Sequence, residues 1–145
     1  MTRPRYDQHS TEFGLWLREQ AELDSRQMGF IATNLDYIWS NYRTGLWMLL
    51  EEKRYNGSIT RAQRGQFKKL DTFARKDDYY RGFHLIVFEL TSPDDGFIKL
   101  NGRAITKDDL IEFLKFSWTE EGLFPRVRAQ EFIFRECIAG QLKLL

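Results

Sequence analysis

Two strand-like runs with a capped helix between them most constrain what this chain can fold into. The run Phe83–Leu90 is apolar along most of its length and predicts a buried strand. In the run Leu46–Lys53, an aromatic residue and several aliphatic residues predict a second strand. Between the two runs, Thr60 opens a helix with the spacing of a capping box to Gln63, and this helix ends near Arg75. The sequence therefore predicts an α/β (α+β) domain.

The remaining segments complete an α-β-β-β-α-β order, followed by a hairpin and helices. Within the helix that Thr60 opens, we expect Phe67, Leu70 and Phe73 to form the apolar face. The other expected elements are a helix from Ser10, its N-cap, to about Leu23, strands at Phe30–Thr33 and Leu35–Ser40, a turn at Asn41–Gly45, a hairpin around Asn101-Gly102, a helix capped at Thr106 that runs to about Phe116, and a fourth helix from Arg126 to Leu142.

Length and composition favour one soluble domain over residues 1–145, with a core at about 10–90 and a C-terminal extension at about 91–145. The single cysteine, Cys137, forms no internal disulfide, which favours a reducing compartment. The longest relevant apolar run, Leu85–Phe88, is far shorter than the ~20 residues of a membrane span. The first residues lack the apolar core of a signal peptide. We therefore expect a cytoplasmic protein that does not bind membranes.

Two acidic residues and a lysine stand where neighbouring strands end. Asp36 lies in an apolar run, and Glu51 is followed two positions later by Lys53 on the same strand face. Adjacent strands can bring Asp36 and Glu51 together, and two carboxylates make an oxygen site suited to Mg²⁺ or Mn²⁺. Lys53 would then orient or deprotonate a water, or bind a phosphate. The ordinary alternative is that these are solvated charges at a strand end.

The order of these residues resembles the PD-(D/E)XK nuclease superfamily, which has the restriction-endonuclease-like fold. The motif here is Leu35-Asp36, then Glu51-Glu52-Lys53, then Gln63 on the next helix, with Leu35 at the position of the family's proline. The resemblance covers residues 10–90 and is closest to small phage-type and Holliday-junction-resolvase-like endonucleases. It implies an α-β-β-β-α-β core with a central mixed sheet.

The resemblance also implies roles for individual residues. By it, Asp36 and Glu51 are metal ligands, the backbone carbonyl of Glu52 adds a third oxygen, and Lys53 is the catalytic lysine. Gln63 matches a frequent glutamine of the following helix, although completing the capping box is an equal alternative. Glu12, or else Glu19, matches an acidic residue of the first helix, although a favourable position at the helix N-terminus explains Glu12 as well.

The net charge of +1 conceals a strongly basic segment. From Lys53 to Arg81 there are nine basic and three acidic residues, which gives +6 and leaves −5 for the rest. In the helix after Lys53, basic residues recur at helical spacing, which suits phosphate contacts as well as an ordinary solvated face. The candidate DNA-binding residues are Arg54, Arg61, Arg64, Lys68 and Lys69.

The sequence thus favours a Mg²⁺- or Mn²⁺-dependent endonuclease that hydrolyses DNA phosphodiester bonds with an activated water. One alternative is a non-catalytic nuclease-fold protein that binds nucleic acid or a partner as an accessory factor. A plain protein-interaction domain, with Asp36 and Glu51 structural, is the other. The resemblance adds a homodimer as an expectation, with the aromatic-rich segment Phe113–Phe134 as its interface or else as a lid over the core. The resemblance also suggests that the protein is encoded by a phage and acts in the host cytoplasm.

Overall fold

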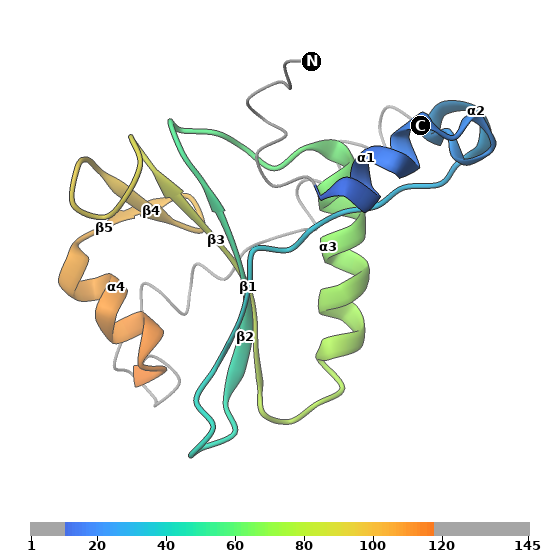
Figure 1. The fold of residues 1–145 in the computed structure, drawn as a ribbon. Helices are drawn as coiled ribbons and strands as arrows, with labels where there is room; N and C mark the ends of the chain where they lie inside the picture. Colours follow the sequence, from blue (N-terminus) through green and yellow to red (C-terminus); the bar gives the residue numbers. More distant parts are fainter. Residues whose placement is uncertain (1–10, 118–145) are drawn as a thin grey trace, which may run out of the picture. The chain divides into compact units, whose positions relative to one another are not determined.

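The structure is a computed structural model that describes residues 11–117 (Figure 1). The chain divides into two compact units, Met1–Thr33 and Asn34–Leu145, and each is described by itself. None of the helices within residues 11–117 is long and apolar enough to cross a membrane. The predicted helix from Arg126 to Leu142 lies outside the described residues.

The first unit contains short helices in place of the single predicted helix to Leu23. Helix α1 spans Glu12–Glu19, and its N-cap is Thr11 rather than Ser10, because the Thr11 hydroxyl accepts a hydrogen bond from the Gly14 amide at 3.0 Å. Gln20 adopts an extended conformation and ends α1. A 3-10 turn (η2, Ala21–Leu23) and helix α2 (Ser25–Met28) follow, and Gly29 ends α2 in the left-handed conformation.

The predicted strand at Phe30–Thr33 is wrong. Residues 29–35 form no strand, and the Phe30 and Ile31 side chains are about half exposed. A strand requires a partner for its backbone groups, and an apolar composition alone does not supply one. Within the described residues, two strands rather than three therefore precede the long helix, so the expected α-β-β-β-α-β order is not reproduced.

The second unit is built on a five-stranded mixed sheet in the order β1-β2-β3-β4-β5. The strands are β1 (Tyr37–Ser40), β2 (Trp47–Lys53), β3 (Tyr80–Phe88), β4 (Ile98–Leu100) and β5 (Arg103–Ile105). Strands β2 and β3 are parallel because helix α3 (Arg61–Ala74) connects them, and the other neighbours are antiparallel. The fold is therefore mixed α and β, as the sequence predicts.

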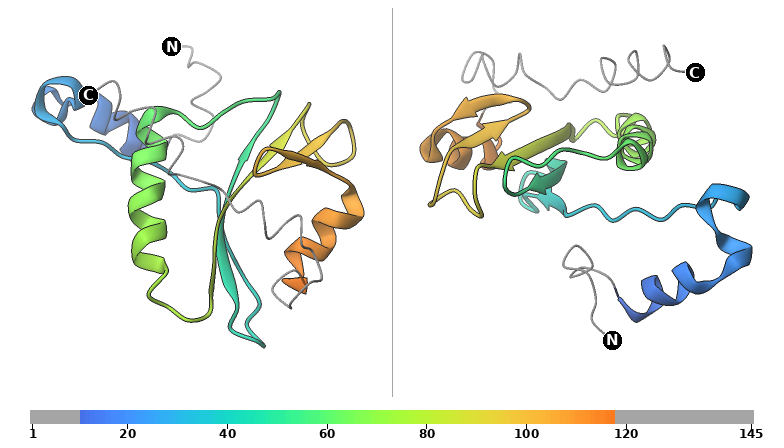
Figure 2. Two further views of the ribbon diagram at one scale, coloured as in Figure 1. Left: turned by 180° about the vertical axis from the view of Figure 1, so that it is seen from behind. Right: turned by 90° about the horizontal axis from the view of Figure 1, so that it is seen from above.

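Each face of this sheet carries its own apolar core, and Figures 1 and 2 show α3 and α4 (Lys107–Leu114) on opposite sides of it. On the α3 side, Leu49 packs with Phe67 and Phe83, and their side chains are almost fully buried. On the α4 side, Met48 and Leu50 pack in a cluster with Phe113. The alternation along β2 thus sends successive side chains into different cores, as predicted.

The buried face of α3 is rotated from the predicted one. Phe67 is buried, but Leu70 and Phe73 are 44% and 61% exposed. The second buried residue is Asp71, one helical turn beyond Phe67, and its carboxylate accepts hydrogen bonds from the Tyr80 hydroxyl at 2.6 Å and the Arg75 guanidinium at 2.9 Å. A paired carboxylate therefore occupies a buried position on α3 in place of the predicted Leu70 and Phe73.

The predicted local signals around the sheet are confirmed. Thr60 caps α3 with a complete capping box to Gln63, and Thr106 caps α4 with one to Asp109. Asn101 and Gly102 both have positive φ, 52° and 92°, as the two-residue turn between β4 and β5 requires. These caps fix where α3 and α4 begin relative to the sheet.

Candidate active site

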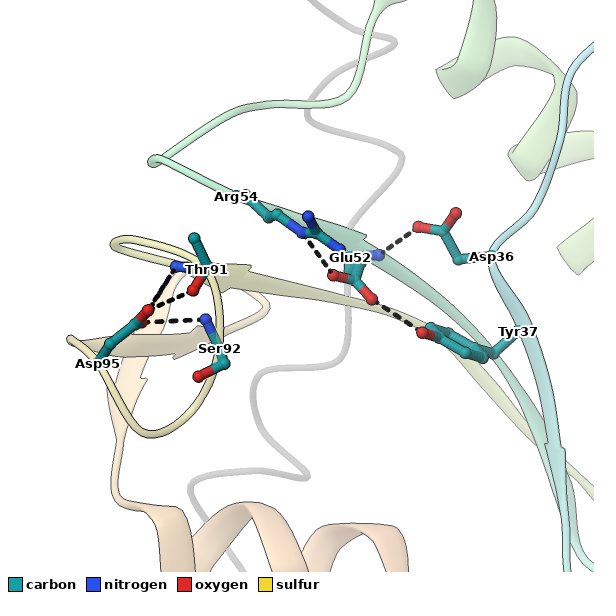
Figure 3. Close-up of polar contacts among 7 residues, drawn as sticks. All are labelled: Asp36, Tyr37, Glu52, Arg54, Thr91, Ser92 and Asp95. Carbon is teal, nitrogen blue, oxygen red and sulfur yellow. Dashed lines mark hydrogen bonds and ion pairs between the residues drawn. The ribbon is translucent and has the colours of Figure 1, made fainter. Parts of the chain in front are cut away.

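Pairing of β1 with β2 brings Asp36 beside Glu51. Tyr37 lies opposite Leu50 in the ladder, so the preceding residue, Asp36, stands next to Glu51. The Asp36 amide donates to Glu51 Oε1 at 3.2 Å. Figure 3 shows the second bond, in which Asp36 Oδ2 accepts from the Glu52 amide at 2.9 Å. The Glu51 carboxylate is therefore bound to the backbone of Asp36, and the Asp36 carboxylate to the backbone of Glu52, although 15 positions separate Asp36 from Glu51.

Lys53 joins this pair from the same face of β2. Its ammonium lies 3.4 Å from Glu51 Oε2 and donates a hydrogen bond to Gln63 Oε1 at 2.9 Å. Gln63 Oε1 also accepts from the Thr60 amide at 3.0 Å, as part of the capping box. One carboxamide oxygen therefore serves the helix cap and the lysine together, so the two alternatives for Gln63 are compatible.

Burial gives Glu51 unusual electrostatics for a strand-end glutamate. Its side chain is 3% exposed, whereas Lys53 retains 19% exposure. Loss of hydration raises the pKa of Glu51 to about 7, and the negative charge of Asp36 adds to the rise while Lys53 opposes it. Two carboxylates at close range with one of them desolvated form a site in which positive charge is strongly stabilised.

Glu52 and Arg54 lie on the opposite face of β2. Glu52 Oε1 accepts from the Tyr37 hydroxyl at 2.9 Å, and Glu52 Oε2 lies 3.5 Å from Arg54 Nε (Figure 3). The hydrogen bond from Tyr37 to Glu52 is the main cause that raises the pKa of Tyr37, and the negative charge of Glu52 is the second. The Glu52 side chain is thus directed away from Glu51, and only its backbone carbonyl can contribute to a site on the α3 face.

The donor set fits a small divalent cation. Carboxylate oxygens are the ligands that Mg²⁺ and Mn²⁺ prefer, and Mg²⁺ commonly binds through one or two carboxylates with waters completing its shell. Asp36 and Glu51 supply such a pair, and burial raises the pKa of Glu51 although Lys53 lies beside it. No cluster of three or more Asp, Glu, His or Cys side chains arranged to bind a metal occurs in residues 11–117.

Comparison of the chain with protein-family models, with curated proteins and with solved structures gives no match. The geometry of the site is therefore the basis for its interpretation.

The structure brings together four of the predicted site residues and leaves others apart. Asp36, Glu51, Lys53 and Gln63 form one hydrogen-bonded group. Glu12 is the first residue of α1, which belongs to the other unit. Its negative charge stabilises the N-terminus of that helix, and its predicted role at the site stays a prediction.

The predicted DNA-binding residues fall on two surfaces. Arg61, Lys68 and Lys69 are exposed on α3. Arg64 is partly buried, and its Nε has no hydrogen-bond partner within the described part of the chain. Arg54 lies beside Glu52 on the other face of β2, so it does not extend the basic surface of α3.

Two contributors were missed at the sequence level. Tyr37 follows Asp36 directly, and the alternation that separates Glu51 from Glu52 could have placed its ring on the face of Glu52. Thr60 was recognised as a cap, but its connection to Lys53 depends on the position of α3 against β2. That position is a tertiary fact without a local sequence signal.

Proposed function

We propose that this protein is a Mg²⁺-dependent endonuclease that hydrolyses phosphodiester bonds in DNA. The observation that supports it is the convergence of Asp36, Glu51 and Lys53 in one group, in the order that resembles PD-(D/E)XK nucleases. The antiparallel β1–β2 pair, followed by α3 and the parallel strand β3, is compatible with the core of that superfamily. We therefore also propose a restriction-endonuclease-like fold.

Asp36 and Glu51 would hold the metal ion, with the Glu52 carbonyl as a third oxygen. Bound Mg²⁺ or Mn²⁺ would supply positive charge for the scissile phosphate and make a water molecule more acidic. The hydrogen bonds from the Asp36 and Glu52 amides fix both carboxylates before the substrate arrives. Such preorganisation avoids the cost of arranging charges during the reaction.

Lys53 would act on the attacking water or on the phosphate. Glu51 and Gln63 engage two of the three N–H groups of its ammonium and leave one without a partner among residues 11–117. That N–H is available to a phosphate oxygen or to a water. Gln63 acts as a positioning residue, because its carboxamide oxygen orients the ammonium and is itself held by Thr60.

The basic surface of α3 would bind the DNA backbone. Arg61, Lys68 and Lys69 are exposed on the helix that also carries Gln63. Lysine and arginine contacts to phosphates supply affinity without reading sequence. DNA bound along α3 would therefore lie close to the carboxylate group.

A cleavage assay tests this function. We expect the full chain to cleave DNA with Mg²⁺ or Mn²⁺ and not with EDTA, and we expect Lys53→Ala to lower the rate by about 100-fold. Lys99→Ala is the matched control, because Lys99 is an exposed lysine on β4, outside the proposed site. DNA cleavage that is unaffected by EDTA and by Lys53→Ala, or no cleavage by the folded wild type, would refute the proposal.

A further inference from the structure

A pocket of about 390 Å³ lies on the α4 side of the sheet, and its lining includes Glu51 as well as Glu52. Its lining includes Tyr37 and Trp39 from β1, Glu52 and Arg54 from the end of β2, Ser92 from the loop after β3, and Leu114 from α4. Its volume falls within the range of about 300–1,000 Å³ that is usual for small-molecule sites. All of these residues belong to the second unit.

The pocket combines apolar walls with a polar rim. The indole of Trp39 is fixed because its Nε1 donates a hydrogen bond of 2.7 Å to the Leu114 carbonyl. The Tyr37 ring is fixed in the same way by its hydroxyl bond to Glu52. Two preoriented aromatic side chains with aliphatic neighbours form a wall on which a flat ring can stack.

The rim carries a carboxylate and a guanidinium, which can form hydrogen bonds with a ligand in the pocket. Glu52 accepts from Tyr37 and contacts Arg54, and a carboxylate retains further lone pairs for an amino or imino donor (Figure 3). Arg54 is 48% exposed, so its guanidinium can reach a phosphate outside the pocket. The stacking wall and the acceptor suit a nucleobase that carries an amino or imino donor, and the peripheral cation suits its phosphate.

The pocket also adjoins the candidate active site, because Glu51 belongs to the lining of the pocket. Tyr37 follows Asp36 directly, and Glu52 follows Glu51, so the pocket and the carboxylate pair lie on the two sides of the same strand ends. The Glu52 residue takes part in both, because its amide holds Asp36 while its side chain lines the pocket. A nucleotide that flanks the one at Asp36 and Glu51 is therefore the occupant that this proximity favours over an unrelated small molecule.

We propose that this pocket binds one unpaired nucleobase of the DNA substrate, with Tyr37 and Trp39 as the stacking surface and Arg54 at its phosphate. This inference rests on the proposed function and narrows its substrate class to DNA that exposes an unpaired nucleotide near the cleaved bond. A base within an intact duplex cannot enter such a pocket unless it leaves the stack.

Binding measured in EDTA tests the pocket without cleavage. The probes are a fluorescent duplex, the same duplex with one unpaired adenosine, and a third duplex with an abasic residue at that position. We expect the full chain to bind the duplex with the unpaired adenosine about tenfold more tightly than the other two. We expect Ser92→Phe, which fills the pocket, to abolish this preference.

Asp94→Phe is the matched control, because Asp94 lies in the same loop with its side chain 81% exposed and does not line the pocket. It should keep the tenfold preference. If Ser92→Phe does not fold, as judged by its thermal melting, Leu114→Trp fills the pocket from α4 and replaces it.

Equal affinity of the wild type for the three duplexes would overturn the proposal, and so would a preference that survives pocket filling in a folded variant. Tight binding of free dAMP without a preference for the unpaired adenosine would also overturn it and would indicate a site for free nucleotides. Failure of the cleavage assay leaves this result unaffected, since binding is measured without metal.

Discussion

Strand β2 ends in two acid–base pairs that have the same kinds of charge and different surroundings. Glu51 and Lys53 face α3, where Glu51 is almost fully buried and bonded to the Asp36 amide. Glu52 and Arg54 line the pocket on the α4 side, where both side chains remain accessible and form an ion pair of similar length, 3.5 Å. Burial raises the pKa of Glu51 to about 7.

The difference teaches that alternation along one strand separates the proposed metal site from the proposed base pocket. Neighbouring residues on β2 point to opposite faces, so Glu51 and Lys53 form one ion pair, and Glu52 forms another with Arg54 just beyond the strand. The group on the α3 face gathers a second carboxylate and a carboxamide, which suits a metal ion. The other group gathers a phenol and an apolar wall, which suits a flat ligand.

The largest effect that distinguishes the two pairs is expected in metal affinity. Glu51→Gln removes a ligand charge and should weaken Mg²⁺ or Mn²⁺ binding by about 100-fold, whereas Glu52→Gln leaves the backbone carbonyl in place and should change it by less than about threefold. Isothermal titration calorimetry on both variants measures this. Equal losses of metal affinity in the two variants would mean that the Glu52 side chain takes part in the metal site as much as Glu51 does.

A smaller difference is expected in the pH dependence of stability without metal. Because the folded state raises the pKa of Glu51 from 4.5 to about 7, the folded protein holds this proton more tightly than the unfolded chain. The resulting stability is fully present below about pH 4.5 and is lost as the pH rises through about 7. In EDTA, the wild type should lose roughly 2 kcal/mol between pH 5 and pH 8 relative to Glu51→Gln.

Denaturant melts of the two proteins at several pH values provide that measurement. Glu52→Gln is the control and should follow the wild type. Parallel pH profiles for the wild type and Glu51→Gln would show that Glu51 ionises normally. Saturating Mg²⁺ at pH 8 should restore stability to the wild type and to Glu52→Gln but not to Glu51→Gln, because a ligand that binds only the folded state stabilises it.

The smallest expected effect concerns the two capping boxes, of which only the one at Thr60 contacts the candidate site. Thr60→Ala and Thr106→Ala should each cost about 1 kcal/mol of stability, because each removes a hydroxyl that accepts from a helix amide. Only Thr60→Ala should also slow cleavage, by severalfold, since the Thr60 box shares Gln63 with Lys53. Equal cleavage by both folded variants would show that the cap does not position the lysine.

The sequence predicts those parts of the molecule that depend on local signals. The caps at Thr60 and Thr106 and the turn at Asn101-Gly102 are confirmed, because each is determined by a few neighbouring residues. The strand at Phe30–Thr33 is wrong because strand formation depends on a distant partner.

In the candidate site, too, the sequence predicts what depends on neighbouring residues and not what depends on tertiary contacts. Strand alternation places Glu51 and Lys53 on one face, and this is confirmed by the shared contact. The amide of Asp36 as a partner of Glu51, and the contact between Gln63 and Lys53, depend on the register of β1 and on the position of α3. The pocket was not predicted, because it joins residues from four separate segments.

The most direct test of the central claim, that Asp36 and Glu51 bind one divalent ion, is a crystal structure of the full chain soaked with MnCl₂. The anomalous signal of manganese locates the ion independently of the interpretation of the site. We expect one Mn²⁺ with carboxylate oxygens of both Asp36 and Glu51 at about 2.1 Å and with Lys53 nearby. A well-ordered site without manganese at saturating concentration, or an ion held by Glu52 on the opposite face, would contradict the claim.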